Sequence, residues 1–209
     1  MMKKLINYIP WILIIVGILV IIGWLFDLRF LIQIYPSFTS MKFITAILFV
    51  LLGFQLFWLK DYLISNQIKG IKTYITILSV SVLIVIFSMF IHLNSNLFEG
   101  LIDLFSMNRK YDPWTTIPHI PSILTCLSFF VISFSQFAVV LYRDSANKIL
   151  CFTYVTLFIV SGLVISGYLT DISWLFRITI FGGGVAIHSS MLFILCGLYL
   201  WYLRSNKYK

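Results

Sequence analysis

Three histidines are the side chains of this sequence best suited to hold a ligand or a metal. His92, His119 and His188 stand at the ends of long apolar stretches. With the membrane topology argued below, all three lie near the outer boundary of the membrane. Imidazoles that converge at one depth have the chemistry to ligate zinc or copper, or to bind a haem iron from both sides. No H-x-x-x-H or Cys/His spacing supports such a site. The alternative is that they are amphipathic side chains at the membrane interface.

Two aspartates recur in matching contexts. Asp27, in GWLFDLRFL, and Asp171, in GYLTDISWL, each follow the end of an apolar stretch. An acid at the bilayer centre costs about 2.5–3.5 kcal/mol on insertion scales, and this cost largely disappears at the boundary. Capping of the following turn, or pairing with Arg29 or Arg177, accounts for both aspartates structurally. Contact with a ligand is the alternative that their repetition supports.

No constellation of side chains indicates an enzyme. The sequence has no Ser/His/Asp set, paired carboxylates or HExxH, and Gly182-Gly183-Gly184 lacks the context of a phosphate loop. Cys126, Cys151 and Cys196 each lie singly in an apolar stretch, which is typical of packing residues. We therefore expect no catalytic residue and no cofactor.

The elements that position these residues are membrane helices. The 209 residues are 61% hydrophobic, 18% aromatic and 11% charged, with a mean hydropathy of +1.02. Soluble domains carry about 25% charged residues, and disordered chains carry few aromatic ones. The apolar runs are also too long and even for the strands of a β-barrel. The predicted fold class is all-α, a polytopic membrane helical bundle formed by residues 1–209 as a single integral membrane domain.

Six stretches approach the roughly 20 apolar residues that cross a bilayer. They are Ile9–Phe26, Phe43–Leu59, Thr73–His92, Ser122–Tyr142, Ile149–Leu169 and Val185–Leu203. Between the third and fourth, NLFEGLIDLFSM has an amphipathic pattern too short to span. We expect it to form a short interfacial helix on the outer surface.

The basic residues set the orientation. With the amino terminus in the cytoplasm, ten Lys and Arg residues fall inside and five outside, which favours two cytoplasmic termini. The inner ones are Lys3, Lys4, Lys60, Lys69, Lys72, Arg143, Lys148, Arg204, Lys207 and Lys209. This asymmetry explains the net charge of +8 without nucleic acid as a partner. The predicted location is a bacterial inner (plasma) membrane, with the lipid bilayer as the first partner.

The sequence also repeats itself. Gly167 and Asp171 follow Gly23 and Asp27 by the same 144 residues, and SSMLFILCGL follows TAILFVLLGF by that spacing. A weaker middle copy, TCLSFFVISF, begins at Thr125. We therefore predict three parallel helical-hairpin repeats, over about residues 8–60, 72–142 and 149–204. Small residues early in the second helix of each repeat allow close helix packing and make a homo-oligomer plausible.

The patterns G-W-L-x-D, from Gly23, and P-x-x-x-S-M-K-x-x-T-A-x-x-F-x-L-x-G, from Pro36, resemble the multi-span amino-terminal membrane regions of bacterial sensor histidine kinases and diguanylate cyclases. GVAIHSSMLFILCGL resembles the closing element of those regions. Their PAS, kinase or GGDEF modules have no counterpart before Lys209. The resemblance implies a sensory membrane module without an output domain, acting through a partner or cut from a longer chain.

Three hypotheses for function follow. The leading one is a non-enzymatic sensory or ligand-binding module that acts through a cytoplasmic signalling partner. The second is a small membrane redox or metal- or haem-binding protein that uses His92, His119 and His188. The third, a transporter or channel subunit, is disfavoured because no stretch carries an ionisable residue near its middle.

Overall fold

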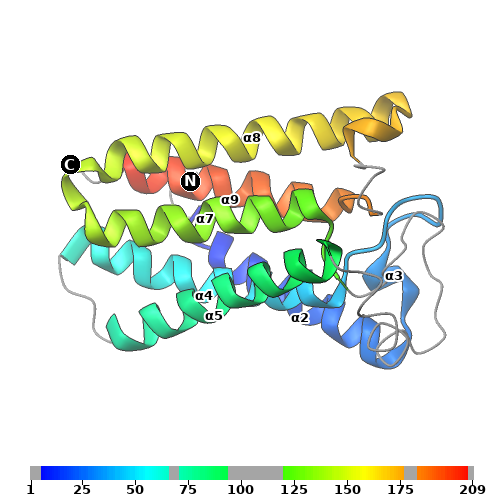
Figure 1. Ribbon diagram of the computed structural model, residues 1–209, viewed down its shortest axis with the longest axis horizontal. Helices are drawn as coiled ribbons and strands as arrows, with labels where there is room; N and C mark the ends of the chain where they lie inside the picture. The colour runs from blue at the N-terminus through cyan, green and yellow to red at the C-terminus, as the bar shows by residue number, and fades with distance from the viewer. Residues whose placement is uncertain (1–5, 66–70, 94–119, 177–182, 207–209) are drawn as a thin grey trace.

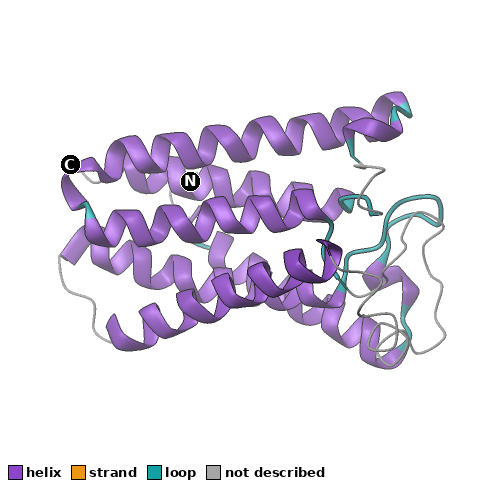
Figure 2. Ribbon diagram, in the orientation of Figure 1, coloured by secondary structure: helices purple, strands orange, loops and turns teal. Residues whose placement is uncertain are grey.

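The computed structural model of the chain describes residues 6–65, 71–93, 120–176 and 183–206, and nearly all of this part is helical (Figure 2). Its long helices are α2 (Ile9–Phe26), α4 (Phe43–Ser65), α5 (Ile71–Leu93), α7 (Ile123–Leu141), α8 (Ala146–Thr170) and α9 (Ile187–Asn206). Its short elements are α3 (Arg29–Ile32) and single 3-10 turns at Arg143–Ser145 and Ser173–Leu175. The predicted helix within NLFEGLIDLFSM lies outside the described residues.

All six long helices are long and apolar enough to cross a membrane. Large apolar side chains cover their outward faces, among them Leu83, Phe134 and Phe152, each about two-thirds exposed. Water would penalise such a surface, whereas lipid matches it. The chain is a multi-span integral membrane protein, and the prediction of six spans in an all-helical bundle is confirmed.

The helix ends run past the predicted spans where polar residues continue the helix. α4 reaches Ser65, beyond the predicted end at Leu59, because Lys60 and Asp61 form a further polar turn. α8 likewise begins at Ala146, before the apolar run opens. Apolar length measures the hydrocarbon core, whereas helical hydrogen bonding continues into the interface.

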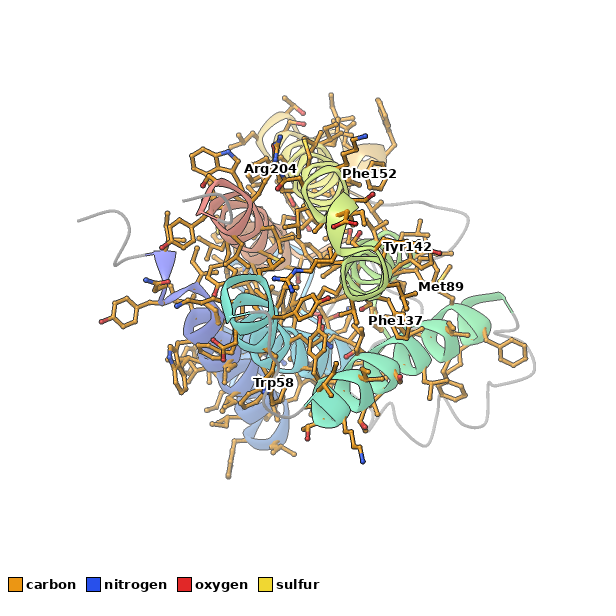
Figure 3. The ribbon with its side chains drawn as sticks, turned by 90° about the vertical axis from the view of Figure 1, so that its left-hand side faces the viewer. Trp58, Met89, Phe137, Tyr142, Phe152 and Arg204 are labelled. Atoms are coloured by element: carbon orange, nitrogen blue, oxygen red, sulfur yellow. The ribbon has the colours of Figure 1, made fainter. Side chains whose placement is uncertain are left out.

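The helices form three antiparallel hairpins: α2 packs against α4, α5 against α7 and α8 against α9. Seen from one end, α4, α7 and α9 surround the middle of the bundle, and α2, α5 and α8 lie outside them (Figure 3). We call the first three the central helices and the others the peripheral helices. Each central helix also packs against the next peripheral helix: α4 against α5, α7 against α8, and α9 against α2.

One end of the bundle carries the segments that follow α2 and α8 (Figure 1). We call it the loop end. The opposite end carries the short turn at Tyr142–Ser145 between α7 and α8.

Three phenylalanines meet at the centre, one from each central helix. Phe49, Phe129 and Phe193 have ring centroids 4.9, 5.0 and 5.0 Å apart, and none is more than 2% exposed. Edge and tilted arrangements at such distances are favourable for aromatic rings. This cluster, which we call the Phe triad, closes the bundle axis with apolar side chains.

Close helix approach in the first hairpin depends on glycine. A Cβ on Gly53 would lie 2.7 Å from the Pro10 carbonyl oxygen, and one on Gly17 would lie 2.7 Å from the Ala46 carbonyl oxygen. Small residues of this kind let membrane helices pack backbone to backbone.

Candidate functional site

Polar side chains are buried at the loop end, in the segment that leads into α4. Thr39, Ser40 and Lys42 are 1–3% exposed. The Lys42 ammonium donates a hydrogen bond to the Ser40 Oγ, with Nζ and Oγ 3.1 Å apart. Burial of an ammonium group is unfavourable unless polar partners surround it. The loop end therefore buries polar side chains beside the apolar Ile32 and Met41.

A second group of hydroxyls lies one helical turn from the Phe triad. Thr45, Thr125 and Ser189 each precede a triad phenylalanine by four residues, so they share its helix face on the loop-end side. All three are buried, and the Thr125 hydroxyl lies 2.9 Å from the Ser122 Oγ. The sequence predicted a packing role for these residues, and their burial is consistent with it.

His188 is the second residue of α9, and it directly precedes Ser189, one of the three hydroxyl residues. Both of its ring nitrogens are buried, and neither has a hydrogen-bond partner in the described part of the chain. The Thr39 hydroxyl is in the same condition. Buried polar groups are nearly always hydrogen-bonded, so unpaired ones point to a group that completes them.

The segments that carry Thr39 and His188 touch. A Cβ on Gly184, four residues before His188, would lie 2.6 Å from the Thr39 Oγ1. The first and third hairpins therefore meet backbone to side chain at the loop end, next to both unpaired groups.

The structure leaves the histidine trio open. His92 is the penultimate residue of α5, near the same end of the bundle as the start of α9, but only its backbone is described. His119 lies outside the described residues. Within the described residues, no three His, Cys, Asp or Glu side chains are grouped as metal ligands. A site formed by His92, His119 and His188 stays a hypothesis.

Asp27 and Asp171 share an unusual backbone conformation. They end α2 and α8 with φ of 60° and 57°, in the left-handed region. Short polar side chains tolerate this region better than most, and it closes a helix. The sequence left a cap on the following turn, pairing with Arg29 or Arg177, and ligand contact as alternatives. Leu28, not Asp27, is the N-cap of α3, and both aspartates are the C-cap residues of the preceding helices. Pairing and ligand contact stay hypotheses.

The loops after these aspartates use corresponding hydrogen bonds. The Leu28 and Ile172 amides donate to the Gly23 and Gly167 carbonyls, both at 2.9 Å. Further along, the Met41 amide donates a hydrogen bond to the Ile32 carbonyl at 2.9 Å, and the Val185 amide donates one to the Phe176 carbonyl at 2.8 Å.

Side chains complete the correspondence. The Trp24 indole donates to the Met41 carbonyl at 2.9 Å, and the Tyr168 hydroxyl donates to the Val185 carbonyl at 2.7 Å. Trp24 corresponds to Tyr168, and Met41 to Val185. The residues in each correspondence are 144 positions apart, which is the spacing of the repeat in the sequence. Gly23 and Gly167 must lack a Cβ, which would lie 2.8 and 2.7 Å from the Cβ of Leu31 and of Leu175.

A buried polar network crosses the bundle beyond the Phe triad, and the sequence analysis missed it. The Gln136 amide nitrogen donates to the Gln55 oxygen at 3.2 Å, and the Gln55 nitrogen donates to the Ser81 hydroxyl at 2.7 Å. The Tyr74 hydroxyl donates to the Gln136 oxygen at 3.0 Å. Gln55 and Gln136 were the available signal, because amides inside membrane spans seek partners on other helices.

At the opposite end, basic side chains are held by neighbours. The Arg204 guanidinium donates to the Tyr154 hydroxyl at 2.6 Å, and Lys60 donates to the Asn7 oxygen at 3.1 Å. The Arg143 guanidinium lies 5.2 Å from the centre of the Tyr62 ring, within the range of a cation–π contact.

Comparisons with models of protein families, with curated proteins and with solved structures found no match to this chain. The geometry of its described residues therefore carries the functional argument.

Proposed function

We propose that the chain is a sensory or ligand-binding module of a bacterial inner membrane, built from three repeated hairpins, which receives its signal at the loop end and acts on a cytoplasmic partner at the opposite end. The observation that carries the proposal is the buried polar loop end, where His188 and Thr39 have no partner among the described residues.

Three similarities support the repeat. The Phe triad takes one residue from each central helix, Asp27 and Asp171 share a left-handed conformation, and the loops after them make corresponding hydrogen bonds. Apolar composition alone favours none of these. The cyclic packing of central against peripheral helices is the arrangement that three copies of one hairpin would adopt.

The Phe triad argues against a channel or transporter. Its three rings fill the axis between the loop-end hydroxyls and the Gln55–Gln136 network. A polar solute crossing along this axis would have to displace three buried aromatic side chains, at a large cost in packing. Binding at the loop end, with movement of helices as the response, requires no such path.

The opposite end is suited to output. Lys60 contacts Asn7 just before α2, Arg143 contacts Tyr62 on α4, and Arg204 contacts Tyr154 on α8, so a shift of one segment changes how these cations are presented. On the proposed topology these cations face the cytoplasm. In the sensor kinase membrane regions that the chain resembles, the last span leads into the output module, so a partner of this chain would meet the end of α9, near Arg204.

The test couples the two ends. A photoreactive amino acid at Trp201, exposed near the end of α9, is activated in native membranes of wild type and of His188→Leu. We expect a discrete adduct with a second protein whose yield changes severalfold in the variant, whereas Leu198→Met leaves it unchanged. Equal yields in all three proteins would refute the proposal.

The histidine trio supports a second candidate function, a redox or metal protein, because the unpaired His188 nitrogens have the chemistry of metal or haem ligands. Purified protein is examined for a Soret band and for stoichiometric zinc, copper or iron. A bound group that is lost in His188→Leu would replace the sensory proposal with this one.

A further inference from the structure

Three interfaces join the hairpins, and each is formed by one central helix and the peripheral helix of the next hairpin. We call them seam 1–2 (α4 on α5), seam 2–3 (α7 on α8) and seam 3–1 (α9 on α2), and each seam includes the other helix and the loop of the two hairpins that meet there. Near the loop end, Ile44 packs against Ile91 and Ile120, and Leu124 packs against the cluster that contains Val164. The first contact lies on seam 1–2 and the second on seam 2–3.

The position that corresponds to these two residues on α9 is His188. It follows Ile44 by 144 residues and Leu124 by 64, as Phe193 follows Phe49 and Phe129. If the repeat holds, this spacing puts an imidazole on seam 3–1 where the other two seams have an aliphatic side chain, and both of its nitrogens are buried without a hydrogen-bond partner among the described residues. This replaces a dispersion contact with an unsatisfied polar group, which weakens an interface.

The same difference recurs deeper in the bundle. Gln55 lies on the stripe of α4 that faces seam 1–2, where it bonds to Ser81 and Gln136. Its counterpart on α9 is Tyr199, which is 0% exposed and whose hydroxyl makes no hydrogen bond among the described residues. A further hydrogen bond joins the first and second hairpins: the Tyr62 hydroxyl on α4 donates to the Val140 carbonyl on α7 at 3.2 Å.

Unsatisfied groups therefore concentrate on one seam. Of the six buried side-chain atoms without a hydrogen-bond partner in the described part of the chain, four belong to Thr39, His188 and Tyr199. Across seam 3–1 at the loop end, the Phe38 and Tyr168 rings have centroids 4.9 Å apart and Gly184 lies against Thr39.

We propose that seam 3–1 is the contact that opens in this protein: α9 separates from α2, and the third hairpin pivots on its apolar contact with α7. Opening gives the His188 nitrogens, the Thr39 hydroxyl and the Tyr199 hydroxyl access to small uncharged polar molecules, water first among them. The other seams stay closed because apolar packing or hydrogen bonds satisfy their corresponding positions. The opening of seam 3–1 does not require the proposed sensory function; only its role as the response to a signal rests on that function.

Distance measurements between pairs of spin labels test the seams one at a time. Leu19, Leu83 and Leu163 lie on α2, α5 and α8 and are 42, 64 and 49% exposed, so labels there face lipid. Pairs are placed in protein whose native cysteines are replaced by serine, and are measured in lipid nanodiscs. We expect the distribution of distances between labels at positions 19 and 163 to be at least twice as broad as the distribution between labels at positions 19 and 83.

The double substitution His188→Leu and Tyr199→Phe should narrow the 19–163 distribution and leave 19–83 unchanged. The matched control Ile44→Leu changes an apolar seam residue and should narrow neither. If the double variant does not fold, wild-type widths decide alone: equal widths for the two pairs, or a broader 19–83, overturn the proposal. No ligand or partner is present, so this outcome is independent of the crosslinking test of function.

Discussion

Truncation of the Phe triad should cost nearly the same stability at each of its three positions. The rings of Phe49, Phe129 and Phe193 are almost equally buried and equally spaced. In lipid the hydrophobic transfer term is small, so the loss is mainly one of packing. A Phe→Ala change removes roughly 100 Å³, which at about 24 cal/mol per Å³ gives about 2–3 kcal/mol if the cavity persists.

The assay is equilibrium unfolding in mixed micelles by a denaturing detergent, followed by tryptophan fluorescence. Phe134→Ala is the matched control, because Phe134 lies on α7 with its ring 65% exposed to lipid, and it should cost under about 1 kcal/mol. Pairs of triad substitutions should deviate from additivity by about 0.5–1.5 kcal/mol, the contribution of an aromatic pair. A cost confined to one phenylalanine, with the other two near the control, would refute the equivalence of the three hairpins.

Three further predictions use the same unfolding assay. Asp171→Gly should be neutral or stabilising by up to about 1 kcal/mol, because glycine adopts the left-handed conformation without strain; clear destabilisation would assign a role to the carboxylate. Gln136→Leu should cost about 1–3 kcal/mol by leaving the Tyr74 hydroxyl unpaired, and Tyr74→Phe in that background should recover part of it. Tyr168→Phe should cost about 1 kcal/mol through the loss of its hydrogen bond, and Trp24→Phe should cost at least as much because it also removes buried ring atoms; no cost at either position would contradict the correspondence of their loops.

The number and order of the helices were readable from the sequence because apolar length has few explanations other than a membrane span. The spacing between Asp27 and Asp171 also indicated two matching turns, which adopt left-handed conformations at those residues. What it could not indicate was how the turn is made, because an aspartate is equally suited to capping the next helix and to ending the previous one.

Contacts between distant parts of the chain were beyond sequence reasoning. The bond between Gln136 and Gln55 joins residues 81 positions apart, and only the packing of α4 against α7 brings them together. The candidate site shows the same limit. His188 was identified as a candidate, but Thr39, whose hydroxyl is also buried without a hydrogen bond among the described residues, stood at an unspecified position of the P-x-x-x-S-M-K pattern and was not marked by it.

The proposed direction of signalling requires the loop end to face the outside of the cell. Ser37, exposed in the loop after α2, and Ser145, exposed in the turn between α7 and α8, are replaced one at a time by cysteine in protein without native cysteines. Intact cells are then treated with a membrane-impermeant thiol reagent. We predict labelling of Ser37→Cys in intact cells and of Ser145→Cys only after permeabilisation. The reverse pattern would place the polar loop end in the cytoplasm and contradict the proposed direction of signalling.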